Sequence, residues 1–311
     1  MAQFLHSVTS VGVILLLTAT GYLCACFGWL TAEGKRFLSK FCMTVATPFM
    51  CVYGLTTNLT REMIAQSHIL LLTPLLSIAC NYALAIPVGR LLKLPRRRLG
   101  VFVMLCSVSN SMFVGYAVCK ELFGDECIPY VMLFYMISTV YTQIIGVGFI
   151  RWAGESEAFS WKAVRKFVTS PIALSIIAGY VIVLLDIPLP ALFVSYIRYM
   201  DRIASPLALL LTGYIIYEIG LKNLRVDLPL MLVMAFRFLV SPLLIVGACA
   251  LFGVAGLPRS VFVIEAAMPT ATVAAVAAAE YGADERFAAE GTALTTLASF
   301  IVIPILMVFL Q

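Results

Sequence analysis

A short pattern occurs twice in this chain, and the two copies are separated by 158 residues, about half of the 311-residue length. The matching pairs are Gly21-Tyr22 with Gly179-Tyr180, Lys40 with Arg198, Ala46-Thr47-Pro48 with Ala204-Ser205-Pro206, and Gly124 with Gly282. The constant offset indicates that one unit was duplicated with almost no net insertion. The fold is therefore expected to contain two similar halves.

The apolar content of the chain determines the environment of these halves. Hydrophobic residues make up 62% of the sequence and charged residues only 12%, whereas a soluble domain carries about a quarter charged residues. The apolar runs are long rather than alternating, which predicts an all-α integral membrane protein in contact with a lipid bilayer. The nine cysteines form no CxxC pair, and they are expected to act as small apolar residues.

Ten apolar segments lie between charged or Gly/Pro-rich breaks. The predicted helices cover residues 6–30, 36–57, 67–91, 98–121, 127–152, 167–186, 190–218, 228–253, 258–281 and 287–310. This pattern divides the chain into a first five-helix repeat (1–152), a connecting loop (153–166) and a second five-helix repeat (167–311). Because five is odd, the second repeat enters the membrane from the opposite face. Inverted repeats of this kind are typical of secondary transporters.

Positive charge predicts the orientation of the helices. The loops after odd-numbered segments hold thirteen Lys and Arg residues, and the loops after even-numbered segments hold three. Since cytoplasmic loops carry the excess of positive charge, both termini are expected on the non-cytoplasmic side. Within the segments, the spacing of Arg198, Asp201 and Arg202 favours local ion pairing. Arg237 lies nearer the middle of its segment, which leaves open a core partner or a functional role.

Two segments at matched positions carry breaks. In the fourth, the polar run Ser107-Val108-Ser109-Asn110-Ser111 interrupts an apolar span, and Ser and Asn compete with the helix for backbone hydrogen bonds. In the ninth, Pro269 cannot donate its backbone hydrogen bond. The offset of 158 places Ser111 opposite Pro269. We therefore expect two discontinuous helices, the fourth and the ninth, that cross each other.

Crossing half-helices direct free N–H groups and partial positive charge at one point, and this suits a carboxylate. Thr47 and Ser205, beside the two matched prolines, are placed to line the path of such a substrate. The predicted substrate-binding residues are Ser109, Asn110, Ser111, Pro269, Thr270, Thr272, Thr47 and Ser205. The alternative is that these hydroxyls only satisfy neighbouring helices and that Pro269 is an ordinary kink.

Glu265 lies one turn before the second break among Ala, Val, Ile and Met. A carboxylate in such surroundings needs a cation, a proton or hydrogen-bond donors. We predict a coupling-ion site for Na⁺ or H⁺, with Na⁺ held by carbonyls freed by the break; the alternative is a purely structural carboxylate. The side chains predicted to complete the site are Asn110, Ser138, Thr139, Thr142 and Gln143.

Other chemistry has no sequence support. The chain has two histidines, no phosphate-binding glycine loop with lysine and no G-x-S-x-G, so we expect neither an enzyme nor an ATP-driven pump. Basic residues are not interleaved with aromatics, and a nucleic-acid partner is not expected. No cofactor is expected apart from the candidate Na⁺.

At several motifs the chain resembles the auxin efflux carrier family, which includes bacterial malate and malonate permeases. Asn110 and Gly115 match the first crossover of that family, although Ala117 replaces its proline. The other matching stretches are Gly21-Tyr22, Gly28-Trp29-Leu30, Ala46-Thr47-Pro48, Glu265 to Pro269, and Glu280-Tyr281-Gly282. The resemblance implies the fold of sodium–bile-acid symporters, with helices 1, 2, 6 and 7 as a scaffold that often dimerises. Helices 3–5 and 8–10 would form the moving transport domain.

These observations predict a secondary active transporter in the cell inner membrane. Its expected substrate is a small organic anion, either a dicarboxylate such as malate or malonate, or an auxin-like carboxylate. The expected mechanism is an elevator-type alternating access. The nearest alternative is a sodium-coupled symporter of a bile-acid-like or pantoate-like anion, and a channel or a membrane sensor for organic anions remains open as a different class.

Overall fold

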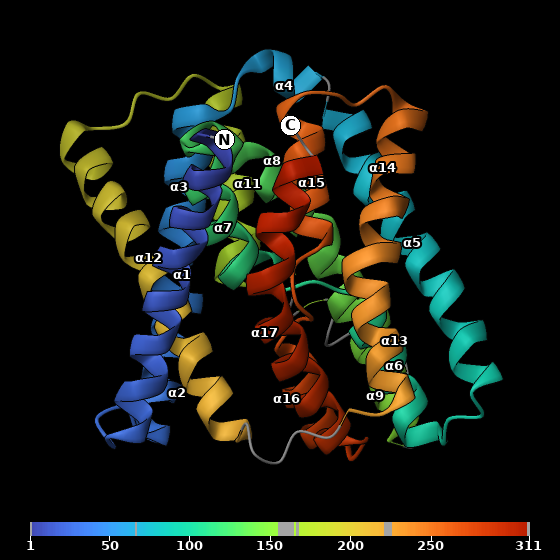
Figure 1. Ribbon diagram of the computed structural model, residues 1–311. Coiled ribbons are helices and arrows are strands. Elements are labelled where there is room, and N and C mark those ends of the chain that lie inside the picture. Colours follow the sequence, from blue (N-terminus) through green and yellow to red (C-terminus); the bar gives the residue numbers. More distant parts are fainter. Residues whose placement is uncertain (1, 66, 155–164, 166–167, 221–225, 310–311) are drawn as a thin grey trace.

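The computed structural model describes residues 2–65, 67–154, 165, 168–220 and 226–309 (Figure 1). Within these residues all regular structure is helical, and β-pairing is limited to one isolated bridge. Most of the predicted connecting loop, 153–166, lies outside the described residues. The two chain ends lie at the same end of the bundle (Figure 1).

Each of the ten predicted segments is helical in the described part of the chain. In the first half the elements are α1 (Ala2–Cys26), α2 (Ala32–Phe41), η1 (Cys42–Ala46), α3 (Thr47–Asn58), α4 (Arg61–Ala65), α5 (Ser67–Leu91), α6 (Arg96–Ser107), η2 (Ser111–Gly115), α7 (Tyr116–Phe123), η3 (Asp125–Cys127), α8 (Ile128–Val140), η4 (Tyr141–Gly146) and α9 (Val147–Ala153). In the second half they are α11 (Pro171–Leu184), α12 (Ala191–Ile219), α13 (Leu228–Ala235), η6 (Phe236–Val240), α14 (Ser241–Phe252), α15 (Leu257–Ala266), α16 (Val273–Tyr281) and α17 (Glu285–Phe309).

Among the residues that the structure describes, five helical runs are long and apolar enough to cross a membrane. They are Ala32–Asn58, Ser67–Leu91, Asp125–Ala153, Leu228–Phe252 and Glu285–Met307. The apolar helices Gly12–Cys26 and Pro171–Leu184 are shorter. Large apolar side chains such as Leu72, Leu243 and Ile301 lie exposed on these helices, as expected where a helix faces lipid. The chain is therefore a multi-pass membrane protein.

Local sequence explains where several helices begin and end. Thr31 precedes α2 and its hydroxyl accepts a hydrogen bond from the Gly34 amide, while the Asp227 carboxylate accepts one from the Leu230 amide at the start of α13. Such caps satisfy amides that have no partner within the helix. At the other ends, α7 and α16 stop at Gly124 and Gly282, whose φ angles are +73° and +71°. This backbone region favours glycine, which explains one duplicated pair.

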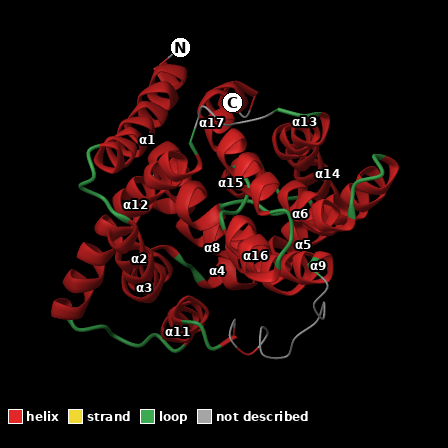
Figure 2. Cartoon of the chain, turned by 90° about the horizontal axis from the view of Figure 1, so that it is seen from below, coloured by secondary structure: helices red, strands yellow, loops and turns green. Residues whose placement is uncertain are grey.

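Two groups of helices stand side by side. Seen along their axes, α1, α2, α3, α11 and α12 gather on one side, and α5, α6, α9, α13 and α14 gather on the other (Figure 2). Helices α8, α15 and α16 lie between these groups, and α17 lies at the edge of the bundle between α1 and α13. The largest cluster of buried apolar side chains extends through both groups, from Ile14 of α1 to Ile245 of α14.

The contact between α1 and α12 depends on glycine. A Cβ atom at Gly213 would lie 2.0 Å from the Thr18 carbonyl oxygen and 2.6 Å from the Tyr22 nitrogen. A Cβ atom at Gly21 would lie 2.0 Å from the Leu210 carbonyl oxygen. Backbone meets backbone at this crossing, so neither helix can accommodate a side chain without moving. Small residues allow this close approach in membrane helices.

We expect Gly213→Val to push α1 away from α12 and to lower the melting temperature of the detergent-purified protein. Overpacking of this kind costs about 1–3 kcal/mol. Gly247→Ala is the matched control, because a Cβ at Gly247 meets nothing within 4 Å. Equal melting temperatures for the two variants would contradict the close helix contact.

Candidate functional site

The two interrupted helices meet in the middle of the protein. Helix α6 ends at Ser107 and α15 ends at Ala266, and the segments that follow pair in antiparallel fashion through a bridge between Ser109 and Thr270. The Asn110 amide donates to the Pro269 carbonyl at 2.8 Å, and the Ala271 amide donates to the Val108 carbonyl at 3.3 Å. Each break therefore satisfies backbone groups that the other has freed, as backbone buried away from water requires.

Both interrupted segments return to helical conformation directly after the crossing. The Asn110 carbonyl accepts hydrogen bonds from Val114 and Gly115 at 3.3 and 3.0 Å, which starts the π-helical turn η2. In the second interrupted segment, α16 begins at Val273. The predicted breaks are thus present at both places, and each is followed by a helix start whose free amides favour negative charge.

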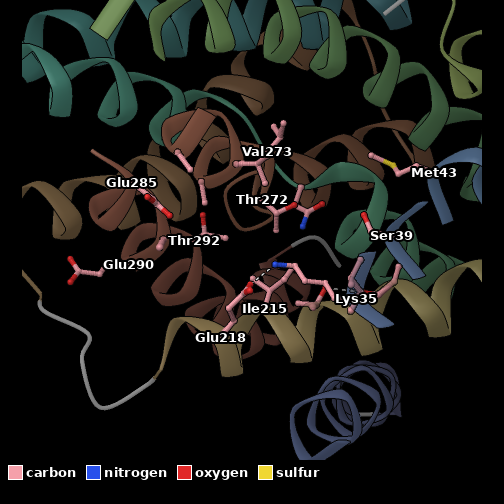
Figure 3. A pocket seen from close by; sticks show the side chains of 18 of the residues that line it. Lys35, Ser39, Met43, Ile215, Glu218, Thr272, Val273, Glu285, Glu290 and Thr292 are labelled. Carbon is pink, nitrogen blue, oxygen red and sulfur yellow. Dashed lines mark hydrogen bonds and ion pairs between the residues drawn. The ribbon is translucent and has the colours of Figure 1, made fainter. Parts of the chain in front are cut away.

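A cavity of about 1050 Å³ reaches the crossing. Its walls come from α2, η1, α12, α16 and α17, and Asn110 and Thr272 of the predicted substrate-binding residues belong to its lining (Figure 3). Thr292 of α17 also lines it. These side chains bring one amide and two hydroxyl groups to the cavity at the crossing. Its volume lies slightly above the usual range of about 300–1,000 Å³ for small-molecule sites.

The remaining cavity wall carries charges that are largely paired. Lys35 of α2 forms an ion pair with Glu218 of α12, and Arg286 Nε lies 2.9 Å from Glu290 Oε1 on α17. Lys35, Glu218 and Glu290 are seen in Figure 3 around the space. Because both cations of the wall already have carboxylate partners, an anion in the cavity would depend chiefly on neutral donors and helix starts.

A threonine cluster supports the second break, and the sequence analysis missed it. The Thr270 amide donates to Thr295 Oγ1 at 3.2 Å, and Thr270 Oγ1 lies 3.4 Å from Thr292 Oγ1 and 3.3 Å from Thr295 Oγ1. The signal was available, because Thr292, Thr295, Thr296 and Ser299 follow the i, i+3, i+4, i+7 spacing of one helix face. A polar stripe on an apolar helix marks the face that turns toward a polar site.

The other predicted substrate-binding residues do not line the cavity. Ser109 and Ser111 are buried, with their hydroxyl oxygens 3.0 Å apart. Pro269 contributes its carbonyl to Asn110. Thr47 is buried at the start of α3, and the buried Ser205 Oγ has no hydrogen-bond partner among the described residues. The structure thus brings part of the predicted set to the cavity and leaves Thr47 and Ser205 outside its wall.

Glu265 is fully buried beside the first break. A Cβ at Gly115 would lie 2.5 Å from Glu265 Oε2 and 2.6 Å from Oε1, so the carboxylate packs directly on the backbone of η2. Oε1 accepts a weak hydrogen bond from Cys119 Sγ at 3.5 Å. Oε2 has no partner at hydrogen-bonding geometry among the described residues, and the hydroxyl of the buried Ser111 is a polar neighbour of the carboxylate. An unsatisfied buried carboxylate oxygen is costly and is a candidate for a proton or a cation.

The predicted oxygens of the fifth segment are placed differently. Ser138 and Thr142 are buried, but the Thr142 hydroxyl donates to the Ser138 carbonyl at 2.6 Å within its own helix. Thr139 and Gln143 are half-buried on the same helix. The carboxylate contacts recorded for Glu265 instead come from η2 and α7. The predicted ligand set remains a hypothesis, and the acid has closer neighbours than the sequence indicated.

Arg237, whose role the sequence left open, reaches both breaks. Its side chain extends from the π-helical turn η6, is 1% exposed, and donates to the carbonyls of Cys106 of α6, Ala266 of α15 and Met268. Arg237 therefore belongs to the site rather than to a distant part of the core.

The local pairing expected for Asp201 is wrong. Its carboxylate is 2% exposed and contacts α7, with Lys120 Nζ at 2.6 Å and the Tyr116 hydroxyl donating at 2.5 Å. Arg198 lies over the Tyr53 ring, and Arg202 is exposed. Desolvation favours a partner that fully satisfies a buried carboxylate. Spacing along one helix could not reveal a partner on another helix.

Comparisons with known proteins agree over nearly the whole chain. The family described as membrane transport protein matches residues 6–307. A protein named as an uncharacterized transporter from Methanocaldococcus jannaschii is 25% identical, over 94% of this chain and 94% of its own length. A second uncharacterized transporter, from Methanothermobacter thermautotrophicus, is 25% identical over 97% of this chain and 98% of its own length.

Thr295→Val should destabilise the purified protein, because it leaves the buried Thr270 amide without its acceptor. The expected loss is about 1–3 kcal/mol, seen as a lower melting temperature. Thr295→Ser keeps the hydroxyl and serves as the control. If the valine variant melts no lower than the serine variant, the bond from α17 does not support the break.

Proposed function

This chain belongs to the membrane transport protein family and is a transport protein rather than an enzyme, and we propose that it is a secondary transporter of a small organic anion. The observation that carries the proposal is the cavity that ends at Asn110, where the two interrupted helices cross. Helix starts and an amide at that point can stabilise a carboxylate without a fixed positive partner. A dicarboxylate such as malate or malonate is our first candidate, and an auxin-like carboxylate is the second.

We further propose ten membrane-spanning segments in two inverted repeats. Matched glycines support this arrangement. Gly21 of α1 touches α12 at Leu210, and Gly179 of α11 touches α3 at Leu55, so equivalent helices of the two repeats each pack on the other repeat. The helix group of α1, α2, α3, α11 and α12 corresponds to the proposed scaffold. The proposed homodimer through this group stays a prediction.

Loop charge supports an inner-membrane orientation with both termini on the non-cytoplasmic side. Lys35 and Arg286 line the cavity and follow odd-numbered segments, so in that orientation the cavity would face the cytoplasm. The Lys120–Asp201 ion pair joins α7 to α12 away from these loops. An elevator movement of the crossing against the scaffold would break this pair and open the opposite side. Two such states give alternating access.

Glu265 is our candidate for the coupling site. The carboxylate lies against η2. Binding of a proton or Na⁺ at Glu265 would therefore depend on the conformation of the first break. Its unpartnered oxygen favours a bound cation or proton over a purely structural acid. This observation also supports the alternative of a sodium-coupled symporter for a larger anion, and the coupling ion is decided by the second experiment below.

Asn110→Ala should reduce saturable uptake of radiolabelled malate or malonate into proteoliposomes by about 10- to 100-fold, since a hydrogen bond to a charged group contributes about 1.5–3 kcal/mol. The variant should still elute as a folded protein. Asn58→Ala is the control, because the Asn58 side chain donates to the Gly54 carbonyl within its own helix. Unchanged uptake by the Asn110 variant would remove this residue from the site.

Glu265→Gln should abolish the dependence of uptake on whichever ion is coupled, because the amide can neither release a proton nor offer a charge to Na⁺. Uptake is measured against Na⁺ at fixed pH and against pH in choline buffer. If both profiles match those of the unmodified protein, Glu265 is structural and the coupling proposal fails.

A further inference from the structure

The two breaks create an electrostatic problem at the ends of α6 and α15. The last carbonyls of a helix have no partner within the helix, and they carry its partial negative charge. Here two such ends face one another inside the protein, at Cys106 and at Ala266 to Met268. Away from water these carbonyls need donors or a cation. A bound Na⁺ is one solution that the sequence suggests.

The side chain of Arg237 supplies the donors that these carbonyls need. Arg237 makes five hydrogen bonds. Nε and Nη2 donate to the Met268 carbonyl at 3.1 and 2.9 Å, and Nη2 also donates to Ala266 at 2.6 Å. Nη1 donates to the Cys106 carbonyl at 3.3 Å and to Ser241 Oγ at 3.3 Å. One planar group with five donors therefore joins both helix ends.

The surroundings hold this guanidinium in one place. Ser241 donates onward to Asn81 Oδ1 at 3.1 Å, and both residues are buried, which connects α14 to α5. No ion pair of Arg237 with a carboxylate is recorded in the described part of the chain. Its counter-charge is thus supplied by carbonyl dipoles. Guanidinium suits such a site because it is less strongly hydrated than a simple ammonium and presents a fixed fork of donors.

We propose that Arg237 is a tethered cation that fills the carbonyl site between the two interrupted helices, so that Na⁺ does not bind there. The consequence of this inference for ion coupling rests on the proposed transport function. A side-chain cation cannot leave during the cycle, so this site adds no ion to the transport stoichiometry. Glu265, whose carboxylate contacts η2 and α7 instead, then stays the candidate site for a coupling ion. Arg237 also fixes the two breaks to each other, so they move as one body.

The test measures melting temperatures of purified protein in matched concentrations of NaCl, KCl and choline chloride. All proteins carry Glu265→Gln, which removes Na⁺ binding to that acid. With Arg237 present, the three salts should give the same melting temperature. Arg237→Ala should melt lower by on the order of 10 °C in choline. Na⁺ should recover part of the loss saturably, because it can enter the vacated carbonyl site and stabilise the fold by binding.

Two further variants separate charge from shape. Arg237→Lys keeps a cation and should be more stable than Arg237→Met, which has a similar length and no charge. A saturable Na⁺ effect with Arg237 intact would overturn the proposal, since the carbonyls would still be open. The proposal also fails if Met is tolerated as well as Lys, or if a folded Ala variant does not respond to Na⁺.

These outcomes do not depend on the substrate. If the Ala variant fails to fold in every salt, the Lys and Met comparison and the salt response of the protein with intact Arg237 still decide the proposal. Melting temperatures can support the tethered cation even if uptake of organic anions is absent. Conversely, normal uptake with a failed salt test would reject the cation and keep the transporter.

Discussion

The structure depends on the satisfaction of backbone polar groups where two helices stop inside an apolar protein. Residues 108–110 and 269–271 exchange amide and carbonyl hydrogen bonds across the crossing, with Asn110 bound to Pro269 and Ala271 bound to Val108. An unsatisfied group at this depth would cost several kcal/mol. Neither break is tolerable alone, because each supplies the partners of the other. The pair therefore has to be kept together as the rest of the protein moves.

At the crossing, the positive and the negative side chain lie at helix ends of opposite polarity. Arg237 sits on the carbonyl ends of α6 and α15, and Glu265 sits against η2, which leads into α7. A cation at helix carboxyl ends and an acid at a helix start both follow the helix dipole. Glu265 and Arg237 thus have different partners. With these separate partners, Arg237 holds the backbone of the crossing, and the proposed ion site at Glu265 would not share its ligands.

Much of this arrangement could be predicted from the sequence, and the limits are physical. Pro269 and the polar run at Ser109 to Ser111 predicted the breaks, because proline and serine disturb the hydrogen bonds of their own helix. Asn110 and Thr272 at the cavity followed from that position. The partners of Arg237, Asp201 and Thr270 could not be derived, since each depends on another helix and a spacing rule describes one helix only. The stripe from Thr292 to Ser299 was readable but was not considered.

The tertiary partners that the sequence could not reveal also limit how the protein moves. Asp201 ties α12 to α7 through Lys120 and Tyr116, on a helix that also walls the cavity through Thr212 and Glu218. Helix α12 therefore contacts the crossing unit at one end and borders the open space at the other. Because α12 is one continuous helix, a shift of α12 that freed Asp201 would also displace this wall of the cavity. In the proposed elevator mechanism, such a shift would couple opening on one side of the membrane to closing on the other.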